Sequence, residues 1–142
     1  MSKEIYLVFC HMDDHPLVNF LKPGFSHVHA LLRSDVAWVL LNPSFSSLDM
    51  VVLGHNDERF LHVYHRMNPE HIIMKLELGD CPDLFWGRAC NMSCVSVIQY
   101  LLGVFWPLTL TPWQLYSKLV SKTPGHIRIL SNGKFQESGE GS

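Results

Sequence analysis

Clusters of positive charge are missing from this chain of 142 residues. Lysine and arginine together number 11, and no segment gathers them into the basic patch that binds a phosphate backbone. Charged residues make up only 17% of the chain, and the formal net charge is -2. We therefore do not expect nucleic acid to be a partner.

Long apolar runs are missing as well. The first apolar segment, residues 5–10, ends at His11 and is too short for a membrane span or for the apolar region of a signal peptide. The four cysteines do not form the disulfide framework of a small secreted domain, so a reducing compartment is expected. We expect neither a membrane span nor a signal peptide.

The sequence does contain enough apolar residues for one packed domain. Hydrophobic residues make up 47% of the chain, and its length suits a single core. Residues 131–142 are polar and rich in glycine, serine and glutamate. We expect one α+β domain over residues 1–130, followed by a disordered polar tail over residues 131–142.

Segments rich in β-branched and aromatic residues predict an antiparallel sheet of about five or six strands. The expected strands are residues 5–10, 25–33, 36–42, 48–53, 60–65 and 72–78, with a last short strand within 125–130. Residues 11–24 are expected to form a polar loop, or a loop with a short helix around residues 17–21. Two C-terminal helices pack against the sheet, one near Cys94 and one from Thr111-Pro112 to about Lys122.

The second and third expected strands form a hairpin around the turn Ser34-Asp35. Strand alternation places His27 and His29 on one face of this hairpin. Asn42 ends the third strand, because Pro43 cannot donate a hydrogen bond to the sheet. The antiparallel return is therefore expected to bring Asn42 close to His27.

Residues 91–103 predict a helix that begins at a cysteine and ends at a glycine. Apolar residues recur at intervals of three and four, and Gly103 occupies the position that a helix end prefers. Cys94 lies in the first turn, where unpaired N–H groups favour a thiolate and can hold an oxyanion. A single helical cysteine is more often an inert buried residue, so its chemical interest depends on a nearby base.

The segment from His27 through Trp38 to Asn42-Pro43 resembles the histidine-to-acid hairpin of the papain and transglutaminase superfamily. The Asn42-Pro43 pair resembles the Asp-Pro of transglutaminase-like proteins, and the Cys94 helix resembles the nucleophile helix of the superfamily. Here the cysteine follows the histidine. That order resembles the circularly permuted branch, which includes lecithin retinol acyltransferase-like proteins and permuted relatives of bacterial cell-wall peptidases. The resemblance covers residues 25–120.

This resemblance implies a papain-like domain and a cysteine hydrolase or acyltransferase that works through a thioester. Cys94 is then the nucleophile, His27 the base and Asn42 the residue that orients the imidazole. The Cys94 N–H and the Asn91 side chain would hold the oxyanion. His29 remains the alternative base. Asn42 stands where the closest motif has Asp, so a protein that keeps the fold without the activity is the other interpretation.

Residues 94–103 and 111–116 also resemble small, unassigned proteins encoded by bacteriophages. This second resemblance implies a virion-associated protein, found in the virion or the host cytoplasm as part of a larger assembly. Its expected partners are other virion proteins or a peptide or peptidoglycan substrate.

A zinc site is the competing interpretation of the cysteines. Cys81, Cys90 and Cys94 with His62, His65 or His71 offer suitable ligand types, but their spacings are not those of zinc knuckles. We expect no metal and no cofactor.

Overall fold

The computed structural model describes residues 3–13, 18–44, 47–78, 93–104, 106, 108–122, 127–131 and 134–137 of the chain. In chain order its elements are β1 (Lys3–Cys10), a 3-10 turn η1 (Val18–Phe20), β2 (His27–Arg33), β3 (Ala37–Pro43), β4 (Leu48–His55), α1 (Phe60–Met67), β5 (Ile72–Leu78), α2 (Cys94–Leu102), α3 (Pro112–Lys122), β6 (Ile127–Ser131) and β7 (Lys134–Glu137). The predicted α+β class and the two C-terminal helices are confirmed. In the part of the chain described, no helix has the length and apolar character needed to cross a membrane.

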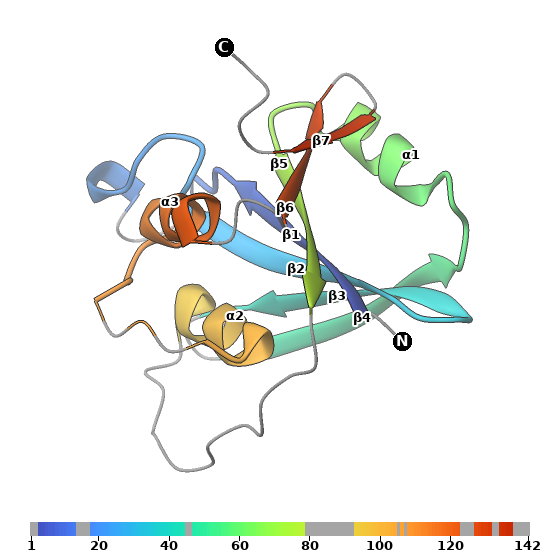
Figure 1. Cartoon of the computed structure of the whole chain (residues 1–142), viewed down its shortest axis with the longest axis horizontal. Helices are drawn as coiled ribbons and strands as arrows, with labels where there is room; N and C mark the ends of the chain where they lie inside the picture. The colour runs from blue at the N-terminus through green and yellow to red at the C-terminus, as the bar shows by residue number, and fades with distance from the viewer. Residues whose placement is uncertain are drawn as a thin grey trace.

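The strands form one antiparallel sheet of seven strands in the order β4-β3-β2-β1-β5-β6-β7 (Figure 1). β1 lies between β2 and β5, so that Leu7 of β1 is opposite Ala30 on one side and Met74 on the other. A central strand that is covered on both faces needs apolar side chains in both directions. This explains why β1 has a nearly continuous apolar sequence.

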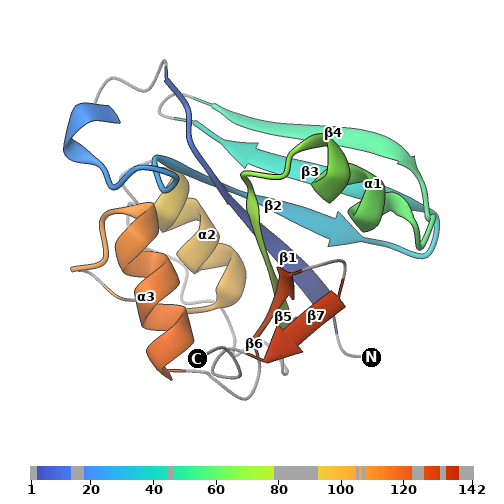
Figure 2. The ribbon, with the colours of Figure 1, turned by 90° about the horizontal axis from the view of Figure 1, so that it is seen from above.

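Helices cover both faces of this sheet. α2 and α3 pack on one face and α1 packs on the other (Figure 2). On β1, Leu7 and Phe9 belong to the core under α2 and α3, whereas Tyr6 and Val8 belong to the core under α1. Successive side chains of a strand point to opposite faces, so the position of a residue along its strand decides which helix it can contact.

Both ends of α2 are stabilised; Gly103 at the C-terminal end was predicted from the sequence, whereas the N-cap Ser93 was not. Ser93 Oγ accepts a hydrogen bond from the Ser96 N–H at 3.1 Å, and Ser96 Oγ accepts one from the Ser93 N–H at 3.0 Å. This reciprocal capping fixes the start of the helix at Cys94. Gly103 ends the helix with φ 69°, a left-handed conformation that glycine adopts without strain.

The strand expected at residues 60–65 is wrong, because these residues form helix α1. Phe60, Leu61 and Tyr64 recur at helical intervals and face the sheet, where Leu61 is buried. The Phe60 ring stacks on Trp38 of β3 with their centroids 5.0 Å apart. A short apolar run fits both the strand and the helix period, and contact with Trp38 decides between them here.

The expected disorder of the tail is wrong for residues 134–137. They form β7 and pair with β6, with Ile129 opposite Gln136. The exposed edge of β6 offers backbone hydrogen bonds that a polar segment can use as well as an apolar one. Polar composition alone therefore did not exclude a strand.

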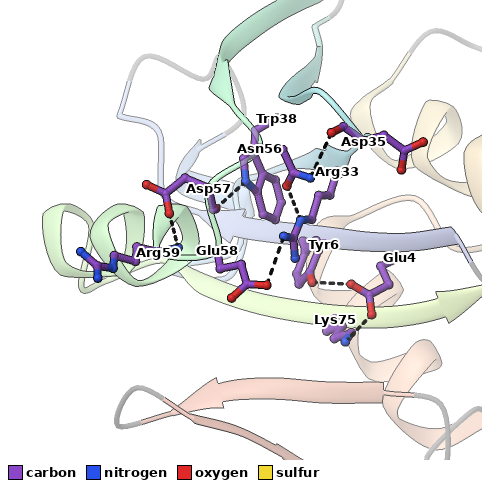
Figure 3. A network of polar contacts seen from close by, with 10 residues as sticks. All are labelled: Glu4, Tyr6, Arg33, Asp35, Trp38, Asn56, Asp57, Glu58, Arg59 and Lys75. Carbon is purple, nitrogen blue, oxygen red and sulfur yellow. Dashed lines mark hydrogen bonds and ion pairs between the residues drawn. The ribbon is translucent and has the colours of Figure 1, made fainter.

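Polar contacts fix where α1 begins relative to the β2–β3 hairpin (Figure 3). Arg33 Nε donates to Asn56 Oδ1, and Trp38 Nε1 donates to the Asp57 carbonyl oxygen at 3.0 Å. Arg33 also lies 3.9 Å from the Glu58 carboxylate. The indole N–H is the buried member of this set, so its bond has the largest effect in holding the segment before α1 against β3.

Candidate active site

His27 and Asn42 form a hydrogen bond at the end of the β2–β3 hairpin. His27 Nε2 donates to Asn42 Oδ1 at 2.7 Å, and His27 is buried. Since an amide oxygen only accepts, this bond places the imidazole proton on Nε2 and makes Nδ1 the acceptor nitrogen. The hairpin thus brings together the histidine and the asparagine that the sequence singles out. Their catalytic roles remain a prediction.

The thiol of Cys94 lies beside the residue that follows His27. Cys94 packs against the core that contains Val28, and the Val28 N–H directs a hydrogen bond to its sulfur. Strand N–H groups lie in the plane of the sheet. The sulfur is therefore close to the peptide that joins His27 to Val28, so helix and hairpin meet at this point.

Burial raises the pKa of the Cys94 thiol, and three backbone N–H groups oppose this effect. They belong, in order of their influence, to Val28, Val95 and Cys94 itself. The expectation that the helix terminus favours a thiolate is wrong in its net direction. The N–H groups act as expected, but removal of the sulfur from water outweighs them.

The N-terminal amides of α2 remain directed at the site. The capping contacts between Ser93 and Ser96 use the amides of those two residues and leave the Cys94 and Val95 N–H groups facing the sulfur. Amides at the start of a helix are donors of the type that can hold an oxyanion. Asn91, the other predicted oxyanion donor, lies outside the residues that the structure describes.

His29, the alternative base, is held by another partner. Its Nε2 lies 3.1 Å from the Tyr64 hydroxyl, and that hydroxyl lies 3.3 Å from His71 Nδ1. Burial, helped by the charges of His27 and His71, lowers the pKa of His29 to about 3. His29 is thus a buried strand histidine that is hydrogen-bonded to Tyr64 of α1.

Sequence reasoning missed the partnership of Tyr64 and His71 with His29. His71 appeared only as a possible zinc ligand, and Tyr64 was assigned to a strand. Tyr64 lies on α1 and reaches His29 across 35 residues of sequence. The helical spacing of Phe60, Leu61 and Tyr64 was the one signal that placed Tyr64 on a face covering the sheet.

Cys81 and Cys90 lie outside the described residues. Over the ranges that are described, no three histidine, cysteine or acidic side chains converge to hold a metal ion.

No family model, no curated protein and no solved structure matches this chain. The interpretation of the site therefore depends on its own geometry.

Proposed function

We propose that the chain is a cysteine hydrolase or acyltransferase in which Cys94 is the nucleophile, His27 the base and Asn42 the orienting residue. The observation that carries this proposal is the bond of 2.7 Å from His27 Nε2 to Asn42 Oδ1. It fixes the tautomer that presents Nδ1 as a proton acceptor, while the Cys94 sulfur is held beside the adjacent peptide.

The proposed reaction begins from a neutral thiol and a neutral imidazole. Because burial raises the Cys94 pKa, the thiol keeps its proton until attack on the substrate. His27 Nδ1 takes this proton as the sulfur forms a bond to the carbonyl carbon. The carbonyl electrons move to the oxygen, where the Cys94 and Val95 N–H groups stabilise the negative charge.

Collapse of this intermediate breaks the bond to the leaving nitrogen or oxygen, which receives the proton from His27. The acyl group is then a thioester on Cys94. A water or an acceptor hydroxyl gives a proton to His27 and attacks the thioester, and the sulfur leaves and regains its proton. Asn42 keeps the imidazole in one orientation through both proton transfers.

The proposed substrates are peptides, peptidoglycan amides or esters, and the proposed setting is a bacteriophage particle. The setting rests on the resemblance of residues 94–103 and 111–116 to small bacteriophage proteins. Mass spectrometry of purified particles tests it, and particles without this chain would contradict it.

A second candidate function is a structural component of the particle that keeps the fold without catalysis. The raised pKa of the partly buried Cys94 thiol favours this alternative. In that case Cys94 is a packing residue of the core under α2.

Covalent labelling distinguishes the two candidates. The probe is a peptide-like electrophile, and the modified cysteine is identified by peptide mass spectrometry. The proposal expects labelling at Cys94 in the wild type, none at this position in Cys94→Ala, and strongly reduced labelling in His27→Ala. His62→Ala, on the exposed side of α1, is the matched histidine control and should label as the wild type does. Equal labelling of wild type and His27→Ala would assign Cys94 a structural role.

A further inference from the structure

Three of the most exposed large apolar side chains lie at one end of the molecule. Phe20 is 87% exposed, Leu108 is 86% exposed and Leu110 is 71% exposed. Phe20 ends η1, and the two leucines belong to the segment that leads into α3. In both views η1 and this segment lie at the same end of the molecule (Figure 1 and Figure 2). We call these three side chains the apolar tip.

Hydrogen bonds hold the two leucines of the apolar tip in their outward position. The buried Gln99 side chain accepts a hydrogen bond from the Trp106 N–H at 2.8 Å and donates one to the Thr109 carbonyl oxygen at 3.0 Å. Thr109 is itself buried, whereas its neighbours Leu108 and Leu110 are exposed. A loop that is already fixed loses little conformational entropy when it binds a partner. The exposure of the leucines is therefore built into the loop.

Two lysines and two tryptophans lie beside the apolar tip. Lys22 Nζ lies 3.3 Å from the centroid of the Trp113 ring, a contact that joins the segment after η1 to α3. Lys118 Nζ lies 5.7 Å from the centroid of the Trp106 ring. Lys118, Trp113 and Leu108 also line one open hollow with a volume of about 370 Å³. Positive charge and indole rings therefore accompany the exposed leucines.

The stretch of chain that forms α2, α3 and the loop between them contains basic residues but no acidic ones. Residues 84–136 include no aspartate or glutamate, although the whole chain has 13 acidic residues. The basic residues of this stretch are Arg88, Lys118, Lys122, Arg128 and Lys134. Asp13, the described acidic residue closest in sequence to η1, forms an ion pair with His11 at 3.0 Å. This charge distribution favours an anionic partner.

We propose that the apolar tip docks onto the surface of an anionic lipid bilayer. Phe20, Leu108 and Leu110 enter the boundary between headgroups and acyl chains, where apolar side chains leave water. Lys22 and Lys118 face the lipid phosphates, and indole rings are preferred at the same depth. Binding of this kind needs no membrane-spanning helix.

The observations favour a bilayer over the other anionic or apolar partners. A nucleic acid offers phosphates but no apolar layer for the exposed leucines. A protein interface of standard size covers about 800 Å² on each partner, and three projecting side chains supply less area than this. A bilayer offers phosphates and an apolar layer together.

Flotation of the full chain with lipid vesicles tests the apolar part of this contact. The wild type should bind vesicles of equal parts phosphatidylcholine and phosphatidylglycerol, and should bind pure phosphatidylcholine much more weakly. Leu108→Ser combined with Leu110→Ser should weaken binding to the mixed vesicles by about tenfold or more. Val63→Ser combined with Met67→Ser is the matched control, because both residues are exposed on α1, which packs on the other face of the sheet. This control should bind as the wild type does.

The charged part of the contact is tested by a second pair of variants. Lys22→Gln combined with Lys118→Gln should weaken binding to the mixed vesicles by about tenfold or more and leave binding to pure phosphatidylcholine unchanged. Arg59→Gln combined with Arg66→Gln removes the same charge at exposed positions beside and within α1, and should bind as the wild type does.

Three outcomes would overturn the proposal. A wild type that does not float with the mixed vesicles would assign the apolar tip to a contact with another protein. A leucine variant that floats as well as the wild type would show that the tip does not enter the bilayer. Equal flotation of the lysine and arginine variants would show that the two lysines do not face the lipid. Cys94→Ala should float as the wild type does, so this result is independent of the proposed catalytic role.

Discussion

Cys10 of β1 lies directly opposite His27 of β2 in the antiparallel pairing of the two strands. The proposed base therefore has two thiols in its neighbourhood, one from a strand and one from α2. Cys10 is only 4% exposed, and burial, with a smaller effect from Cys94, raises its pKa to about 11. Cys94 is half-buried and has three N–H groups directed at its sulfur. Cys94 is therefore the more accessible of the two thiols.

The first prediction separates these thiols. Cys10→Ala should leave labelling of Cys94 by the peptide-like electrophile unchanged, because Cys10 takes part in neither proton transfer. Labelling is measured at each cysteine by peptide mass spectrometry, which also separates Cys94 from Cys81 and Cys90. Cys94→Ala is the negative control, because it removes the thiol that the probe is expected to modify. Loss of labelling in Cys10→Ala, with the fold intact by circular dichroism, would make Cys10 part of the site.

The second prediction concerns the protonation of Cys94. Burial raises its pKa, so the rate of alkylation by iodoacetamide should increase with pH through a midpoint above the value of about 8.5 for an unperturbed thiol. The same chain unfolded in urea gives the reference midpoint. A midpoint below that reference would show a resting thiolate, and the neutral-pair mechanism would then be wrong.

The third prediction tests the orienting role of Asn42. Asn42→Asp keeps an oxygen on His27 Nε2 and adds a negative charge that favours the imidazolium, so electrophile labelling of Cys94 should increase by about tenfold. Asn42→Leu has a similar volume but cannot accept the hydrogen bond, and labelling should decrease. Equal rates in all three proteins would remove Asn42 from the site, provided that their melting temperatures show that each variant is folded.

The hairpin part of the site was predictable because its determinants are local. Strand alternation and a tight turn are enough to bring Asn42 to His27, and the observed bond of 2.7 Å agrees with that expectation. Helix α2 and its end at Gly103 were predictable for the same reason, since helix periodicity and a terminal glycine are properties of adjacent residues.

The protonation of Cys94 and the surroundings of His29 were not predictable in this way. The Cys94 pKa depends on how deeply α2 packs against Val28, which local sequence does not specify. His29 depends on Tyr64, whose helix was taken for a strand because a short apolar run fits either period. Both failures involve contacts between distant segments.

The fourth prediction concerns the Tyr64 hydroxyl, which lies between His29 and His71. Tyr64→Phe removes this hydroxyl and leaves the buried His29 ring nitrogen without it, so the free energy of unfolding should fall by about 1–3 kcal/mol. Urea unfolding measures the change. Tyr100→Phe is the matched control, because Tyr100 is exposed on α2 and should cost much less. If Tyr64→Phe and Tyr100→Phe lower the free energy of unfolding equally, the Tyr64 hydroxyl between the two histidines contributes nothing to stability.

The last prediction concerns the stability of the protein in acid. Burial lowers the pKa of His29 to about 3, with smaller contributions from the charges of His27 and His71. In the unfolded chain a histidine has a pKa of about 6.5, so between these two values the unfolded state binds a proton that the folded state excludes. At a pH above the pKa of His29 in the unfolded chain, the fold therefore keeps its full stability. This stability is lost as the pH falls toward the pKa of His29 in the folded protein.

Between about pH 7 and about pH 5, the titration of His29 alone should lower the free energy of unfolding by about 2 kcal/mol. His29→Gln keeps a hydrogen-bonding group near Tyr64 but cannot titrate, so its unfolding free energy should decrease by that much less over the same interval. Carboxylates contribute equally in both proteins and cancel in the comparison. His62→Gln, at an exposed position of α1, should keep the wild-type slope. An unchanged slope in His29→Gln would mean that the folded protein accepts a proton at His29, against the burial that the structure gives it.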